Sequence, residues 1–171
     1  LQTGNLAYKT GFSFTKRDSW VTKGILGLLF TKEIDSTLNY LLQKADKILD
    51  NTKISIVLPE NLSVHTFSIN VILGNLLDNA IEAAQNSKEK YLGIDIRTKR
   101  GLLFITIENS YDGSIQLHKN EIVTSRKNKE SHGIGLKNVK MIVEEQGGEM
   151  QVIWVNNRFV VKVMLYLSAL N

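Results

Sequence analysis

The order of apolar and polar positions predicts helices that alternate with paired strands. Three segments repeat their apolar residues at helical spacing: 34–49, 67–85 and 136–145. Five shorter runs have the composition of strands: 53–58, 92–98, 102–108, 150–155 and 158–167. This order predicts an α+β fold, a two-layer sandwich in which a mixed, mostly antiparallel sheet carries its helices on one face.

Turn residues separate these elements. Lys99-Arg100-Gly101 and Asn156-Asn157 each join two strands as a hairpin turn. Residues 110–131 are polar and predict a loop of about twenty residues, a length that is usually functional in a compact domain. Residues 1–33 show no sustained period. We therefore predict one domain over 34–171, preceded by an N-terminal segment (1–33) of unclear role.

Composition narrows the classes of function. The chain has 171 residues, a length that suits one domain able to bury roughly two-thirds of its unfolded surface. The 21 basic and 17 acidic residues are scattered along the sequence, a pattern that argues against a nucleic-acid partner. The absence of cysteine excludes disulfides and thiolate metal sites, and it fits a reducing compartment.

Membrane and targeting signals are missing from the sequence. The apolar stretch from Gly24 to Phe30 is far shorter than the ~20 residues of a membrane span, and no signal peptide is recognisable. Because the chain opens at Leu1 without a methionine, we expect it to be part of a longer protein. Any membrane-spanning part would then lie upstream.

The segment 67–85 carries a polar stripe on an otherwise apolar helix. Asn75, Asp78, Asn79 and Glu82 stand at positions i, i+3, i+4 and i+7, and so share one side. Asparagine is a poor helix former, because its side chain competes for backbone hydrogen bonds. An oxygen ligand directed at a hard cation would explain two asparagines here. A solvated helix face is the alternative.

A second candidate is the start of the next helix, Gly133-Ile134-Gly135-Leu136. Glycines at a helix N-terminus let the free backbone N–H groups approach an anion closely. The pattern is neither a P-loop nor a dinucleotide-binding fingerprint. The preceding loop carries cations that could reach a polyphosphate: Arg126, Lys127 and Lys129. The alternatives are a plain helix entry and a solvated loop.

A third candidate lies at the end of the strand 102–108, in the run from Ile107 to Gly113. A strand terminus holds its last side chains rigidly, which suits recognition of a base. The amide oxygen of Asn109 can accept a hydrogen bond from the amino group of adenine. An ordinary Asx-turn is the alternative for this residue.

Together the three segments resemble the N, G1 and G2 boxes of the GHKL superfamily, which joins gyrase, a heat-shock chaperone, MutL and histidine kinases. The run from Asn75 to Ala83 is similar to the N box, and the run from His132 to Val139 is similar to the G2 box. Ile34 to Ala45 is similar to the lead-in helix of sensor histidine kinases related to the peptide-quorum-sensing receptors of Gram-positive bacteria. The resemblance covers residues 34–167 and implies the Bergerat ATP-binding fold.

The resemblance implies ATP and Mg²⁺ as cofactors. Asn79 would be the Mg²⁺ ligand and Asn75 would line the phosphate site. Where hydrolysing members carry a glutamate that activates water, this chain has Asn75, which cannot accept a proton, so phosphoryl transfer is favoured over hydrolysis. The remaining cofactor-binding residues implied are Asn109, Gly113, Arg126, Lys127, Gly133, Ile134, Gly135 and Leu136.

The G1 box departs from the usual Asp-x-Gly-x-Gly of the superfamily. Asn109 replaces the aspartate and Tyr111 replaces the first glycine, whereas Gly113 remains. A neutral amide makes a weaker contact with adenine than a carboxylate does, since charge-assisted hydrogen bonds are stronger. We therefore expect weak nucleotide binding.

The resemblance also implies partners. The histidines are His65, His118 and His132, none of which precedes the lead-in helix. We therefore expect an upstream phosphoacceptor dimerisation domain, a response regulator, and a homodimer of the full-length protein. The chain would be a cytoplasmic domain of a membrane-anchored receptor. Two alternatives stay open: a serine kinase of the anti-sigma type, disfavoured because such kinases retain the glutamate, and a degenerate module that acts only through protein contacts.

Overall fold

The computed structural model describes residues 12–15, 32–58, 65–112, 115–118, 121–124 and 132–167. Within these residues the chain forms the helices α1 (Lys32–Ile48), α2 (Thr66–Gln85) and α3 (His132–Glu145). The strands are β1 (Phe12–Thr15), β2 (Asn51–Val57), β3 (Tyr91–Lys99), β4 (Leu102–Ser110), β5 (Ile115–His118), β6 (Glu121–Thr124), β7 (Glu149–Val155) and β8 (Arg158–Tyr166).

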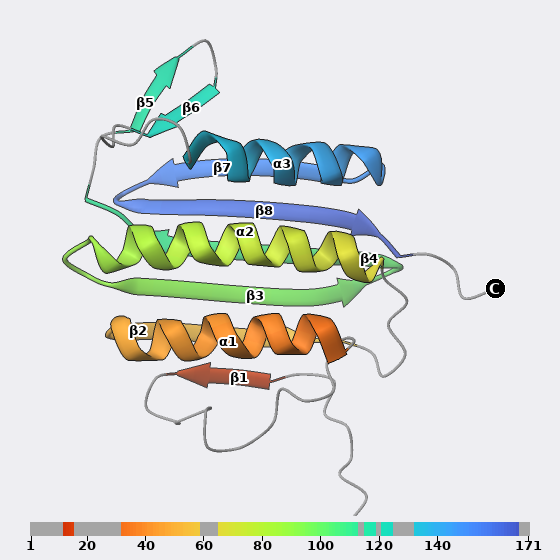
Figure 1. Ribbon diagram of the computed structural model, residues 1–171, viewed down its shortest axis with the longest axis horizontal. Helices are drawn as coiled ribbons and strands as arrows, with labels where there is room; N and C mark the ends of the chain where they lie inside the picture. The colour runs from red at the N-terminus through yellow and green to blue at the C-terminus, as the bar shows by residue number, and fades with distance from the viewer. Residues whose placement is uncertain are drawn as a thin grey trace, which may run out of the picture.

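In the described part of the chain, six strands form one sheet in the order β1-β2-β3-β4-β8-β7. The β2–β3 pair is parallel and the other pairs are antiparallel. All three helices lie on the same face of this sheet (Figure 1). The predicted α+β sandwich, with a mixed and mostly antiparallel sheet, is therefore confirmed.

Short-range chemistry explains the connections between strands. The parallel β2–β3 pair needs a crossover, and α2 supplies it on the helix face. Both hairpins turn through two residues with positive φ: Arg100 and Gly101 at 51° and 74°, and Asn156 and Asn157 at 49° and 59°. Such pairs form the turns whose twist matches that of the strands, and asparagine and glycine tolerate this backbone best. The sequence predicted both turns.

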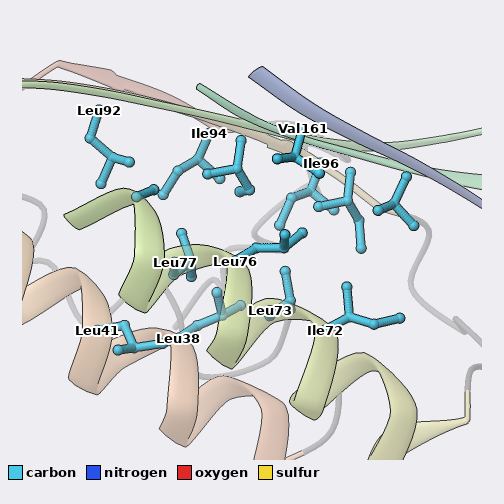
Figure 2. Close-up of a cluster of buried hydrophobic side chains, with 14 of the residues drawn as sticks. Leu38, Leu41, Ile72, Leu73, Leu76, Leu77, Leu92, Ile94, Ile96 and Val161 are labelled. Atoms are coloured by element: carbon cyan, nitrogen blue, oxygen red, sulfur yellow. The ribbon is translucent and has the colours of Figure 1, made fainter. Parts of the chain in front are cut away.

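The hydrophobic core lies between the sheet and the three helices, and Figure 2 shows its part under α1 and α2. Leu73 and Leu76 of α2 point at the sheet, and Leu38 of α1 packs beside them. Leu92, Ile94 and Ile96 of β3 and Val161 of β8 face them from the sheet (Figure 2). Burying each such side chain contributes about 1.5–3 kcal/mol. This packing holds α2 in place, so the polar residues on its remaining surface have a fixed direction.

Two strands were missed in the predicted loop over 110–131. This segment contains β5 and β6, which form a separate two-stranded antiparallel sheet. Each strand has only four residues, too few for an alternating pattern to stand out among polar neighbours. The prediction of a structureless loop is therefore wrong for these eight residues.

Two further boundaries differ from the sequence reading. β1 lies within residues 1–33 and pairs with β2, so part of this segment extends the main sheet. α3 begins at His132, four residues before the predicted start at Leu136. The sequence pattern did not reveal this first turn because it contains Gly133 and Gly135, and glycine is a poor helix former. Among the described helices, none is long and apolar enough to cross a membrane.

Candidate functional site

The first turn of α3 meets the middle of α2. Figure 1 shows α3 running opposite to α2, with its N-terminus beside the C-terminal half of α2. A Cβ atom added to Gly135 would lie 3.1 Å from Asn75 Oδ1 and 3.1 Å from Asn79 Nδ2. The structure therefore brings two amides of the N box against the bare backbone of the G2 box. Any side chain at position 135 would have to displace them.

Asn75 is held in one orientation by its own helix. Its Nδ2 donates to the carbonyl oxygen of Val71, one turn earlier, at 2.8 Å. This bond explains how an asparagine is accommodated in mid-helix, and it fixes the amide plane. The amide oxygen of Asn75 is then one of the two atoms nearest to a Cβ added at Gly135, at 3.1 Å. A fixed acceptor at this position suits a cation better than an anion.

Asn79 carries an unsatisfied polar atom. Its Nδ2 is buried and has no hydrogen-bond partner in the described part of the chain. Such a group costs about 1–3 kcal/mol of stability. Rotating the amide by half a turn would exchange Nδ2 and Oδ1, so Asn79 can present a donor to a phosphate or an oxygen to a metal ion. The atom therefore lacks a partner that a ligand could supply.

The donor set fits Mg²⁺ held largely by a nucleotide. Among the described residues, no group of three or more His, Asp or Glu side chains could hold a metal ion by itself. Mg²⁺ commonly takes one or two protein oxygens and completes its shell with phosphates and water. The amide oxygens of Asn75 and Asn79 match this requirement, and Gly135 lets the backbone of α3 approach them closely.

The polar residues of the α2 stripe contact two neighbouring helices, α1 and α3. Asp78 pairs with Lys44 of α1 at 2.8 Å, and this hydrogen bond raises the pKa of Lys44, with Glu82 adding to the effect. Both partners are about half exposed, so the ion pair is worth about 1 kcal/mol or less. Asn75 and Asn79 of the stripe lie against Gly135 of α3.

Asn109 stands on the helix-facing side of β4, between Leu92 of β3 and Phe159 of β8. It is only 3% exposed, and its Nδ2 donates to the carbonyl oxygen of Ser110 at 3.0 Å. This bond sets the amide plane and leaves Oδ1 as the atom that can accept from a base. The location at the end of β4 agrees with the expected strand terminus.

The end of β4 is tied to the α2–β3 connection by side chains that sequence reasoning missed. Ser110 Oγ lies 2.6 Å from Ser87 Oγ, and Asp112 Oδ2 accepts from the backbone N–H of Lys88 at 2.6 Å. Tyr111 N–H donates to the carbonyl oxygen of Asn157 at 3.1 Å. No local pattern could have revealed these contacts, because they join segments more than 20 residues apart.

The remaining predicted residues have the following places. Gly133 and Ile134 lie in the first turn of α3, and Leu136 packs partly buried against the core. Gly113, Arg126, Lys127 and Lys129 lie outside the described residues. Among the histidines, His65 stands at the N-cap of α2, where its Nδ1 is 3.1 Å from Ser68 Oγ. His65 makes no capping hydrogen bond with its side chain, and its ring is paired with the Ser68 hydroxyl instead.

Comparison with known proteins places this geometry in context. Residues 64–166 match the family model of the GHKL domain. No curated protein matches the sequence. Two nucleotide-free structures of the catalytic domain of histidine kinase ThkA are similar to this chain. One is 18% identical with a TM-score of 0.57 and covers 80% of this chain and 90% of its own. The other is 17% identical with a TM-score of 0.59 and covers 92% and 95%.

The histidine kinase AdeS of Acinetobacter baumannii is also similar, at 17% identity and a TM-score of 0.50. The match covers 79% of this chain and 63% of AdeS, so the chain spans less than two-thirds of that structure. At these identities the likeness establishes a shared fold. It says nothing about which residues bind a ligand.

Proposed function

Because the chain belongs to the GHKL domain family, we propose that it is the ATP-binding catalytic domain of a sensor histidine kinase. In this role it binds Mg·ATP and transfers the γ-phosphate to a histidine on an upstream dimerisation domain. The acceptor then passes the phosphate to a response regulator. The full-length protein is a homodimer anchored in the membrane, with this domain in the cytoplasm. The resemblance of the N and G2 boxes favours a peptide-quorum-sensing receptor.

The observation that carries this proposal is the contact of Asn75 and Asn79 with the backbone of Gly135. The phosphates would lie between the N-box amides and the N-terminal turn of α3, whose free N–H groups and positive dipole favour anions. Asn79 would hold Mg²⁺, which neutralises charge on the phosphate oxygens when bound. Catalysis by this domain is then mostly positioning and charge neutralisation.

The chemistry of the amides favours transfer to a protein acceptor over hydrolysis. Neither Asn75 nor Asn79 can take a proton from water. The purified chain should therefore release phosphate from ATP negligibly and should not phosphorylate itself. Rapid phosphate release that depends on Asn75 would favour a hydrolase instead.

The direct test is calorimetric titration with ATP, with and without Mg²⁺. The unsubstituted chain should bind ATP in a Mg²⁺-dependent manner, and Asn79→Ala should lose that dependence while remaining folded. Asn86→Ala is the matched control, because Asn86 lies exposed at the C-cap of the same helix and its side chain donates to Glu82 O. If Asn79→Ala binds Mg·ATP with unchanged affinity, Asn79 is not the Mg²⁺ ligand.

One observation favours a second candidate, a module that acts only through protein contacts. The Asn109 side chain is almost fully buried, and one of its amide hydrogens is already used by Ser110 O. Such a residue is satisfied without a base. The same titration separates the two candidates, because a contact module would not bind ATP at any Mg²⁺ concentration.

A further inference from the structure

Arg158 lies on the sheet face opposite the helices, directly behind the strand end that carries Asn109. Side chains alternate between the two faces along a strand, and Phe159 faces Asn109 on the helix side. Arg158, the preceding residue, therefore projects to the other face, where it pairs in register with Ser110. It thus lies near Asn109 across the β4–β8 pair, on the face opposite the proposed nucleotide site.

Three groups hold the guanidinium of Arg158. Its Nη1 donates to Glu89 Oε2 at 2.6 Å and its Nη2 contacts Glu89 Oε1, so that the pair is bidentate. Its Nε lies 3.1 Å from Glu108 Oε1. Its Cζ is 4.2 Å from the centre of the Tyr91 ring, at stacking distance. Only a planar fork can satisfy these three directions at once.

Gly93 makes room for this arrangement. A Cβ atom added to Gly93 would lie 2.7 Å from the Tyr91 hydroxyl and 3.2 Å from Cζ of its ring. The ring therefore lies over the bare backbone of Gly93, which is the register partner of Glu108. Arg158, Tyr91, Glu89 and Glu108 together form what we call the outer clamp. Its members come from β8, β3, β4 and the α2–β3 connection.

The outer clamp holds both chain neighbours of Asn109. Glu108 is held by Arg158, and Ser110 Oγ accepts from the N–H of Tyr91 at 2.8 Å. The carbonyl oxygen of Ser110 is in turn the group that accepts from Asn109 Nδ2. The direction of Asn109 Oδ1 therefore depends on where the clamp places the residues on either side of it.

We infer that Arg158 is a positioning residue for base recognition, which acts by fixing the β4 end so that Asn109 Oδ1 faces the adenine amino group. This inference rests on the proposed function. A neutral amide gains little from charge, so its hydrogen bond depends on alignment. A rigid support behind a binding side chain is what such alignment requires. The charged groups of the clamp supply that support without entering the site.

The test compares ATP with inorganic tripolyphosphate, which has the phosphates but lacks the base and the ribose. Arg158→Lys keeps the charge but loses the fork, so Mg·ATP affinity should fall roughly fivefold, the loss of one hydrogen bond. The preference for ATP over GTP should fall with it. Binding of inorganic tripolyphosphate with Mg²⁺ should be unchanged, because Asn75, Asn79 and Gly135 do not touch the clamp.

Arg97→Lys is the matched control. Arg97 lies on the same sheet face and pairs with Asp95 at 3.5 Å, with a more exposed side chain. It should change neither ligand's affinity. Glu108→Gln removes a single clamp contact and serves if Arg158→Lys does not fold. Gly93→Ala, which displaces the Tyr91 ring, should reproduce the loss of base discrimination.

Two outcomes would overturn the inference. If Arg158→Lys lowers ATP and tripolyphosphate affinity equally, Arg158 supports the fold as a whole and does not position Asn109. If neither affinity nor the ATP/GTP ratio changes in Arg158→Lys, the clamp has no role in binding. A different result would contradict the proposed function: the unsubstituted chain would bind no ATP. The inference about Arg158 would then be wrong as well.

Discussion

The two ends of the candidate site are built differently. Where α2 meets α3, Asn79 Nδ2 is buried without a partner in the described chain, and both amides lie against Gly135. At the end of β4, the Asn109 amide, the two serine hydroxyls and the Asp112 carboxylate all have protein partners. We call these the phosphate end and the base end.

This difference in hydrogen bonding predicts different roles in ligand binding for the two ends. An unsatisfied polar group raises the free energy of the unliganded protein, and a ligand that pairs with it recovers that cost on binding. The phosphate end should therefore provide most of the affinity. The base end gains little from a ligand because its groups are already bonded, but its rigidity can discriminate between bases. Affinity and selectivity would thus reside in separate parts of the fold.

The largest effect is expected from a substitution that adds a side chain at the phosphate end. Gly135→Ala places a methyl group 3.1 Å from both Asn75 Oδ1 and Asn79 Nδ2, closer than ordinary van der Waals contact. We expect Mg·ATP affinity to fall at least about tenfold, or ~1.4 kcal/mol. Calorimetric titration with ATP and with tripolyphosphate should show the same loss, because the methyl group acts on the phosphate end.

Gly74→Ala is the control for this substitution. Gly74 lies in α2, one residue from Asn75, and an added Cβ there meets no atom within 4 Å. Both substitutions raise helix propensity by about 0.5–1 kcal/mol. Gly74→Ala should therefore stabilise the protein and leave affinity unchanged. Equal affinities in the two variants would mean that the amides at Gly135 do not contact the nucleotide.

A carboxylate at the base end is the next test. Asn109→Asp offers adenine a charged acceptor, which on sequence grounds should tighten ATP binding by ~1 kcal/mol. The structure adds an opposing effect. The aspartate loses the donor to Ser110 O and places a carboxylate oxygen near that carbonyl, 3.0 Å from the present Nδ2. We therefore expect the free energy of unfolding to fall by about 1 kcal/mol and affinity to gain little.

Urea unfolding and ATP/GTP titration of Asn109→Asp check this expectation. Asn109→Ala is the companion variant, since it removes the amide without adding charge. A stable Asn109→Asp protein that binds ATP several times more tightly would show that the carbonyl of Ser110 can turn away. The base end would then be less rigid than the comparison requires.

Sequence reasoning singled out the residues of the proposed phosphate end because their signals are local. Asn75 and Asn79 are one helical turn apart, and Gly135 opens the next helix, so each segment could be recognised from its own pattern. The structure adds that these segments contact each other. The fold class and both hairpin turns were predictable for the same reason, since periodicity and turn chemistry act over a few residues.

The outer clamp could not be predicted in this way. Arg158 and Glu89 are 69 residues apart, and their contact depends on the register of β4 with β8. Gly93 looks like an ordinary strand glycine until the Tyr91 ring is seen above it. Strand register depends on the packing of the whole sheet, so a short segment of sequence does not predict it.

The smallest expected effect concerns the charge of the base end, where acid should weaken the clamp. The hydrogen bond from Arg158 lowers the pKa of Glu89 below its ordinary value of 4.5. A carboxylate with a lowered pKa in the folded state stabilises the protein above its unfolded pKa, and this contribution disappears as pH falls through the folded pKa. Because Glu89 is largely exposed, solvent screening limits the effect to a few tenths of a kcal/mol.

Glu89→Gln should therefore be slightly less stable than the parent near pH 7 and equally stable near pH 3, as measured by urea unfolding at both values. A difference that persists unchanged at the lower pH would mean that Glu89 acts through packing, and the clamp would not be electrostatic.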